Sequence, residues 1–286
     1  MQTVFYGNSK YVIPIIEVLD LILIVTTEKN LTDPVIDYAI KNQIPYLSVT
    51  TLSDKDTLEK INKYKTDVAV LADFGLIIPD TILSLYPKGI INIHPSLLPK
   101  YRGPTPVQSA LLNNDLNTGI TLIRLDRDVD HGPIIAQKKV SLLYTDTNDT
   151  AYIKLFGEGA NLLNENLEEY VNGKINPADQ MHAHATYTDK LTRSSGYFDI
   201  TNPPSTETIN RMIHAYHPWP GAWSKVQMAN SKWQIVKFLP EGKLQMESKK
   251  PVSFKDFYNG YPELRSIIER VMNSEFPPKA DQPMAE

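Results

Sequence analysis

Short apolar segments alternate with longer amphipathic segments through the first hundred residues. Runs of this length suit buried strands better than helices. They lie at Val4–Tyr6, Leu21–Val25, Tyr46–Val49, Val68–Leu71 and Ile90–Ile93. The segments between them predict helices near residues 11–19, 33–43 and 53–64. Regular strand–helix alternation predicts an α/β fold with a doubly wound, mostly parallel sheet.

The pattern continues to residue 173 and then changes. We expect a helix over 104–113, strands over Gly119–Leu125 and Ile134–Val140, and a long helix over 148–172. Residues 1–173 would then form one catalytic domain. Residues 174–205 are rich in Pro, Ser and Thr with little apolar periodicity, which predicts a linker or an extended strap.

A second, smaller domain is predicted over residues 206–262. A helix near 206–216 precedes alternating runs at 222–228, 232–239 and 243–248, a pattern that indicates a small antiparallel barrel. Residues 263–286 form a tail that becomes Pro-rich and polar, and we expect it to be partly disordered.

Composition changes this picture in one respect, because charge is segregated along the chain. The net charge of −4 over 286 residues argues against an overall basic nucleic-acid binder. Residues 1–206 hold 18 Lys/Arg and 24 Asp/Glu, whereas residues 207–262 hold 8 Lys/Arg and 4 Asp/Glu.

Cysteine is absent, which excludes disulfides and thiolate metal sites. No apolar stretch is long enough for a membrane span and the N-terminus has no basic region, so we expect a cytoplasmic protein. We also expect a monomer, although the sequence has no signal for the oligomeric state.

The end of the run at residues 90–93 carries candidate chemistry. Asn92 and His94 lie two residues apart, so in a strand their side chains share one face. An amide beside an imidazole suits acyl-type reactions, because one stabilises a developing oxyanion and the other handles a proton. An Asp from the loop at 125–133 would complete a triad. The alternative is that both residues only cap or satisfy the following turn.

The acidic loop permits two other interpretations. Asp126, Asp128 and Asp130 could suggest a metal site, but the loop lacks the ligand rhythm of an EF-hand, so no metal is expected. Gly7-Asn8-Ser9 follows the first run like a dinucleotide-binding turn. It lacks the G-x-G-x-x-G spacing, so a Rossmann cofactor site is not predicted.

Three motifs, in this order and spacing, resemble the folate-dependent formyltransferases that use 10-formyltetrahydrofolate. They are Asn92-x-His94-x-Ser96-Leu97-Leu98-Pro99-x-Tyr101-Arg102-Gly103, Thr118-Gly119-Ile120-Thr121 and Asp130-x-Gly132. The segments His217–Trp223 and Lys249–Phe257 are similar to the second domain of the branch that formylates methionyl-tRNA.

The resemblance implies a function and a set of residues. It implies transfer of the formyl group of 10-formyltetrahydrofolate to the α-amine of methionyl initiator tRNA, with Asn92, His94 and Asp130 catalytic and no metal. It also implies an OB-like barrel in the second domain. The implied folate-binding residues are Phe74, Gly75, Leu76, Ile77, Ile78, Ser96, Leu97, Leu98, Pro99 and Val129. Candidate tRNA-binding residues are Lys29, Arg102, Lys225, Lys237, Lys249 and Lys250, with Arg102 equally able to hold its own loop together.

Some positions depart from the family pattern. Asp128 and His131 stand where relatives carry small residues, and His214 stands where many carry Arg. The segment at 26–33 has one lysine where the tRNA-specific branch has a basic insertion. Two other functions therefore remain open: formylation of a nucleotide-linked amino sugar with the same donor, and a catalytically silent module that binds tRNA or folate.

Overall fold

The chain forms two compact units in a computed structural model that describes residues 1–27 and 33–272. Lys29 lies outside the described residues. Unit 1 comprises Met1–Pro106, Asn117–Leu142 and Ala151–Asp189. Unit 2 comprises Val107–Leu116, Leu143–Thr150 and the chain from Lys190 onward.

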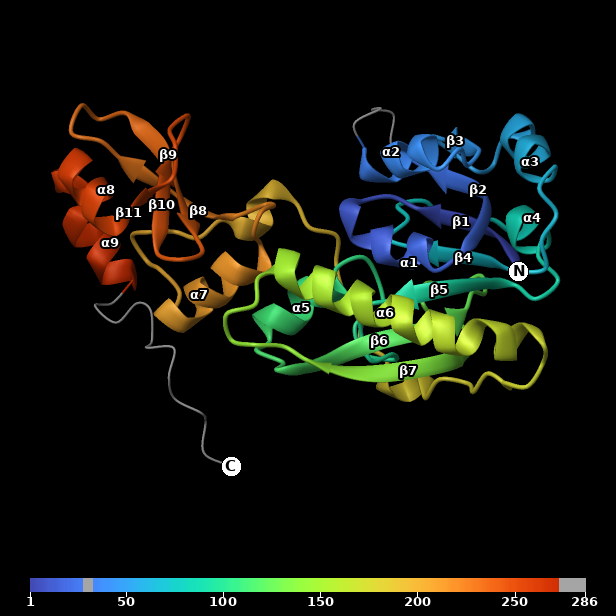
Figure 1. The fold of residues 1–286 in the computed structure, drawn as a ribbon. Coiled ribbons are helices and arrows are strands. Elements are labelled where there is room, and N and C mark those ends of the chain that lie inside the picture. Colours follow the sequence, from blue (N-terminus) through green and yellow to red (C-terminus); the bar gives the residue numbers. More distant parts are fainter. Residues whose placement is uncertain (28–32, 273–286) are drawn as a thin grey trace. The chain divides into compact units, whose positions relative to one another are not determined.

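A seven-stranded sheet with the order β3-β2-β1-β4-β5-β6-β7 forms the centre of unit 1 (Figure 1). The strands are β1 (Gln2–Gly7), β2 (Asp20–Thr26), β3 (Tyr46–Ser48), β4 (Ala69–Ala72), β5 (Ile90–His94), β6 (Asn117–Arg124) and β7 (Ile134–Ser141). The first five are parallel, and β6 and β7 add antiparallel to the edge. The predicted mostly parallel α/β sheet is confirmed.

Helices follow the strands where the sequence predicts them, with one addition. They are η1 (Lys10–Val12), α1 (Ile13–Glu17), α2 (Pro34–Lys41), α3 (Lys55–Ile61), α4 (Asp80–Leu83), α5 (Pro106–Leu112) and α6 (Asn148–Val171). Asp33 and Asp54 begin α2 and α3, because each carboxylate accepts backbone N–H bonds of the first turn. The one-turn helix α4 was not predicted, since four residues carry no periodicity.

Strand β5 lies inside the sheet between β4 and β6, and all five of its residues are buried. Three are isoleucines, as expected for a strand covered on both faces. The other two are Asn92 and His94, which are 6% and 4% exposed. Buried polar side chains need hydrogen-bond partners, so these two mark the place where the sheet meets polar groups of other segments.

The sequence left two alternatives for residues 174–205, a linker or an extended strap, and residues 178–188 form a strap. Residues 178–188, called the strap here, pack along unit 1 through bridges between Ala178 and Ile134 and between Tyr187 and Arg102. They include the short helix η2 (His182–His184). Unit 1 therefore extends to Asp189 and not to the predicted boundary at residue 173. Backbone pairing with loops far away in sequence fixes the strap, and apolar periodicity carries no such signal.

Unit 2 contains a four-stranded antiparallel sheet with the order β11-β10-β9-β8. Its elements are η3 (Arg193–Gly196), α7 (Thr206–Ala215), β8 (Ala222–Gln227), β9 (Trp233–Leu239), β10 (Lys243–Met246), β11 (Val252–Ser253), α8 (Phe254–Gly260), η4 (Pro262–Leu264) and α9 (Arg265–Met272). The closed OB-like barrel stays a prediction.

The first ten residues of the predicted tail, 263–272, are part of unit 2, and the disorder expected further along stays a prediction. Helix α9 packs Ile268 and Val271 into the core of unit 2, where they are 0% and 1% exposed. An amphipathic helix of eight residues gains its stability from this burial rather than from local propensity. Residues 273–286 lie outside the described part of the chain. In that described part, no helix is long and apolar enough to cross a membrane.

Candidate active site

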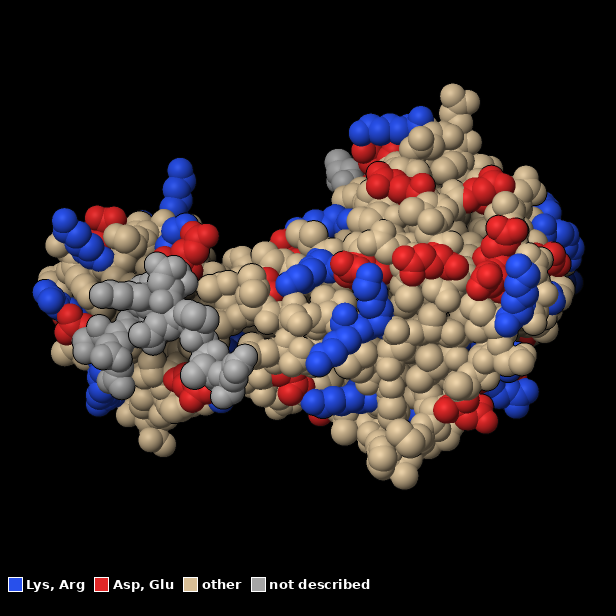
Figure 2. Space-filling model, turned by 60° about the horizontal axis from the view of Figure 1, so that its bottom comes forward, with Lys and Arg blue, Asp and Glu red and all other residues tan. Residues whose placement is uncertain are grey.

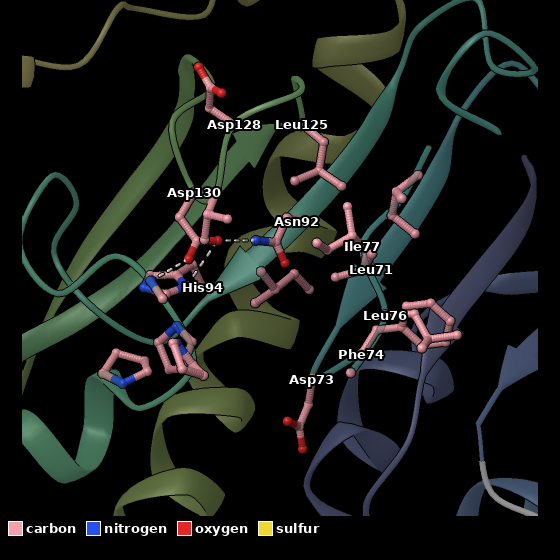
Figure 3. A pocket seen from close by; sticks show the side chains of 18 of the residues that line it. Leu71, Asp73, Phe74, Leu76, Ile77, Asn92, His94, Leu125, Asp128 and Asp130 are labelled. Carbon is pink, nitrogen blue, oxygen red and sulfur yellow. Dashed lines mark hydrogen bonds and ion pairs between the residues drawn. The ribbon is translucent and has the colours of Figure 1, made fainter. Parts of the chain in front are cut away.

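Three polar side chains from two segments meet at the carboxyl end of β5. Asn92 and His94 come from the strand itself, and Asp130 comes from the loop between β6 and β7. Asn92 Nδ2 donates to Asp130 Oδ1 at 3.0 Å, and His94 Nδ1 lies 3.5 Å from the same oxygen. Figure 3 shows the Asp130 carboxylate between the other two side chains. Ligands of parallel α/β sheets bind at such strand ends.

The orientation of His94 is set by its second ring nitrogen. Nε2 lies 2.9 Å from the carbonyl oxygen of Tyr101 and donates to it, because a carbonyl oxygen only accepts. The imidazole is therefore held between a backbone acceptor and the Asp130 carboxylate. In this position Nδ1 faces the carboxylate and can exchange a proton with it or with a water beside it.

The Asp130 carboxylate is also fixed from a second side. The backbone N–H of Gly103 donates to Oδ2 at 2.7 Å, while Asn92 occupies Oδ1. Gly103 has a φ of 108° and a Cβ there would lie 2.8 Å from the carbonyl oxygen of Thr188. Glycine is required because both the backbone conformation and the close strap exclude a side chain.

A cavity of about 420 Å³ opens beside these residues. This is within the range of roughly 300–1,000 Å³ typical of small-molecule sites. Its lining includes Phe74 to Ile78 and Val129, which are among the predicted folate-binding residues. Tyr152 and Phe156 of α6 close another side, and the sequence carries no signal for them beyond helix periodicity.

Four other predicted folate-binding residues, Ser96 to Pro99, do not line this cavity. Ser96 Oγ donates to the carbonyl oxygen of Lys100 at 2.6 Å, and Thr121 donates to the carbonyl oxygen of Ser96. Leu97 packs on Gly119, where a Cβ would lie 2.3 Å from its Cδ2. These contacts shape the loop that carries Tyr101 and Gly103. Their part in the site is therefore to build the loop rather than to form the cavity wall.

Arg102 is not available to a phosphate, although it was among the predicted tRNA-binding residues. Its side chain is 1% exposed, and its guanidinium donates to Gln180, Tyr187 and the Nδ1 atom of His182. Of the two roles open from the sequence, the geometry supports the one in which Arg102 holds its loop. Burial of a guanidinium requires such a set of acceptors.

The other acids of the loop point elsewhere. Asp126 Oδ2 accepts from His131 Nδ1 at 2.7 Å, and the Asp128 carboxylate points away from Asn92 and His94 in Figure 3. Among the described residues, no group of three or more His, Cys, Asp or Glu side chains could hold a metal ion.

The fold and the site together define a class: α/β proteins in which an amide, an imidazole and a carboxylate meet at the carboxyl edge of a parallel sheet. The sequence profile described as "Formyl transferase" matches residues 23–167. The methionyl-tRNA formyltransferase of Roseiflexus sp. (strain RS-1) is 42% identical over 68% of this chain, and the match spans 59% of that relative. The one from Dictyoglomus turgidum (strain DSM 6724 / Z-1310) is 31% identical over 96% of this chain and 100% of its own. The chain belongs to the formyl transferase family.

Solved structures share the fold at low sequence identity. A sugar N-formyltransferase from Shewanella sp. FDAARGOS_354 superposes with a TM-score of 0.66 at 16% identity, covering 84% of this chain and 98% of its own. At this identity the similarity shows the fold alone and does not decide the acceptor.

Proposed function

We propose that the protein transfers the formyl group of 10-formyltetrahydrofolate to the α-amino group of methionyl initiator tRNA. The observation that carries the proposal is the convergence of Asn92, His94 and Asp130 beside a cavity of ligand size. The relatives at 31% and 42% identity bear the corresponding name.

The proposed reaction needs no nucleophilic side chain. The neutral amine attacks the formyl carbon, and the tetrahedral oxyanion accepts hydrogen bonds from the Asn92 amide and from His94 in the form that carries a proton on Nδ1, because Nε2–H is already bonded to Tyr101. Asp130, through a water, removes the proton from the attacking amine and relays it to the folate nitrogen. The bond from the formyl carbon to that nitrogen then breaks as the carbonyl re-forms. Preorganisation supports these roles, because all three side chains are already held by hydrogen bonds.

The donor would occupy the cavity of unit 1. Phe74, Leu76 and Ile77 offer an apolar wall for a flat ring system, and the cavity extends from them to Asn92 (Figure 3). A formyl group bound at the Asn92 end would lie against the amide and the imidazole. The pocket therefore fits a donor with an aromatic head and a reactive group beside it.

The tRNA would contact the outer sheet face of unit 2, formed by the outward residues of β8, β9 and β10. Ala222, Ser224 and Val226 point inward, so Trp223 and Lys225 point outward. Strand pairing places Lys237 opposite Trp223 and Gln245 opposite Lys237 on the same face. Lysines interleaved with aromatic rings suit phosphates and bases, as on OB-like folds, and Lys249 and Lys250 follow β10.

This local arrangement matters because the face of the molecule in Figure 2 has no single basic patch. Lys and Arg are interspersed with Asp and Glu over that face. A net charge of −4 agrees with such mixing. Recognition of a polyanion would then depend on a few lysines placed together rather than on long-range attraction.

The acceptor is tested by single-turnover formylation with 10-formyltetrahydrofolate, offering either methionyl initiator tRNA or a UDP-linked amino sugar. Formyl-methionyl-tRNA should form with the wild type and be lost with His94→Ala. The matched control is His184→Ala, since His184 is exposed on the strap. Transfer to the sugar alone would overturn the tRNA assignment and leave the formyl transfer chemistry in place.

The tRNA surface is tested by salt dependence. Lys225→Ala with Lys237→Ala should weaken tRNA binding and reduce the slope of log K against log salt by about 0.7–0.9 for each lysine–phosphate pair that is removed. Lys55→Ala with Lys41→Ala removes equal charge from helices of unit 1. An equal change in slope for the control pair would refute the assignment to the outer sheet face.

A further inference from the structure

Gln180 of the strap makes two hydrogen bonds to the backbone of the Asp130 loop. Its Nε2 donates to the carbonyl oxygen of Asp130 at 2.9 Å and to that of Gly132 at 2.7 Å. The side chain is 5% exposed. Both N–H protons of one side-chain amide therefore bond to the carbonyls of the two residues on either side of His131, from a position 50 residues further along the chain.

The two hydrogen bonds hold the backbone at Asp130, and the backbone conformation there sets the direction of the Asp130 side chain. Asp130 has a φ of 48°, in the left-handed region that residues other than glycine adopt only occasionally. Such a conformation persists only where surrounding contacts hold it. On the other side of the loop there is no space to move, because a Cβ on Gly132 would lie 1.9 Å from the carbonyl oxygen of Arg124. The loop is thus fixed between β6 and Gln180.

Gln180 is itself fixed by Arg102. Its Oε1 accepts from Arg102 Nε at 3.2 Å and from Nη2 at 2.7 Å. Nη2 also donates to His182 Nδ1 at 2.8 Å, and Nη1 donates to the hydroxyl of Tyr187 at 3.3 Å. These hydrogen bonds from one buried guanidinium hold three residues of the strap in place. An amide so fixed cannot turn its Oε1 toward the loop without breaking the bonds to Arg102.

A ring contact joins the strap to the same loop a second time. The imidazoles of His131 and His182 stack with their centroids 4.0 Å apart and their planes 3° apart. His131 is the residue between Asp130 and Gly132, and it is held from behind by Asp126. His131 is also one of the positions where the sequence departs from the family pattern. In this chain the unusual histidine at position 131 stacks on His182 of the strap.

We propose that Gln180 is a positioning residue for formyl transfer, which holds the Asp130 backbone so that its carboxylate meets Asn92, His94 and Gly103. The proposal rests on the function proposed above. Without the two amide donors, the strained loop relaxes and the carboxylate leaves the Gly103 N–H. A shift of about 1 Å in a reacting group can lower a rate by about 100-fold. The cavity wall at Phe74 to Ile78 comes from a different segment and is not affected.

The test is Gln180→Glu, which has nearly the same shape. An ionised carboxylate keeps the Arg102 contacts as charge-assisted bonds but cannot donate to either carbonyl. We expect a loss of about 10- to 100-fold in the single-turnover rate, with unchanged KM for 10-formyltetrahydrofolate. The thermal midpoint should fall as well, because two buried carbonyl oxygens lose their donors, so the rate and not the stability carries the test. Asn166→Asp is the matched control, because its amide also donates to a backbone carbonyl, that of Leu162, away from the cavity.

A double-mutant cycle separates positioning from a general structural role. Once Asp130 is replaced by Ala, nothing is left to position, so Gln180→Glu should cause no further loss of rate in that background. A merely structural role would give the same fold loss in both backgrounds and overturn the proposal. A wild-type rate in Gln180→Glu alone would also overturn it.

A crystal structure of Gln180→Glu supplies a readout that is independent of the acceptor. The hydrogen bond from Gly103 N to Asp130 Oδ2, 2.7 Å long in the wild type, should be broken. If that hydrogen bond persists, the positioning role is wrong. If it is broken while the wild type fails to formylate methionyl-tRNA, the positioning role stands and the proposed acceptor falls.

Discussion

Replacement of Asp130 by Asn tests the arrangement at the strand end with the smallest change of shape. Each carboxylate oxygen accepts one hydrogen bond, from Asn92 Nδ2 at 3.0 Å and from Gly103 N at 2.7 Å. An asparagine amide has a single acceptor oxygen. Whichever way it turns, its own N–H₂ group faces a donor, so one of the two bonds is broken and one buried donor stays unsatisfied.

The expected magnitudes follow from that count. An unsatisfied buried donor costs about 1–3 kcal/mol, so the free energy of unfolding should fall by about that amount. The rate should fall much further, by about 100- to 10,000-fold, because the proton acceptor is removed together with its charge. KM for the donor should change little, since the apolar wall at Phe74 to Ile78 is untouched.

Single-turnover formylation and urea unfolding measure the two effects. Asp128→Asn is the matched comparison, because it removes one charge from the same loop while its carboxylate points away from Asn92 and His94 (Figure 3). Its loss of rate should be far smaller than that of Asp130→Asn. The reasoning would be refuted by a loss of less than about tenfold in Asp130→Asn, or by equal losses in the two variants.

Two further predictions concern stability. Tyr6 and Tyr86 are buried with their hydroxyls 2.7 Å apart, so Tyr86→Phe leaves the Tyr6 hydroxyl without its partner and should lower the unfolding free energy by about 1–3 kcal/mol. The variant with both tyrosines replaced by Phe should be closer to wild type in urea unfolding, because no hydroxyl is left unsatisfied. If the two single losses simply add in the double variant, this reasoning is wrong. Burial lowers the pKa of His217 below its ordinary value, with Asp149 and Glu241 opposing the shift and His214 adding to it. The unfolded chain therefore binds more protons below about pH 6.5, so stability should fall as the pH falls through that range. His217→Gln should flatten that part of the unfolding profile between about pH 7 and 5, and an unchanged profile would count against it.

The sheet was predictable because its strands are short apolar runs with helices between them. Strands β4 and β5 are buried on both faces and therefore consist mostly of apolar residues, which can be recognised in the sequence alone. Helix α9 was missed because it lies in a segment whose end is polar and Pro-rich. Its amphipathic pattern over eight residues becomes meaningful only beside the core of unit 2.

The adjacency of Asn92 and His94 followed from the sequence, since strand geometry with a period of two places them on one face regardless of the rest of the fold. The choice of Asp130 among three acids needed the family spacing. The burial of Arg102 and the placement of Ser96 to Pro99 outside the cavity wall could not be predicted. Both depend on segments brought together only by folding, such as the strap against the loop at 101–103.

The sequence by itself therefore determined the α/β class, the strand that carries the amide and the imidazole, and the family. The first two are local properties, because hydrophobic periodicity is visible within a few residues of chain. The family follows from the order and spacing of motifs along the chain, which can be read without knowledge of the fold. The tertiary structure alone decided that the segment after residue 173 completes unit 1 and that Gln180 and Arg102 brace the loop of Asp130. Hydrogen bonds between residues 50 and 78 positions apart obey no period, so only the folded chain reveals them.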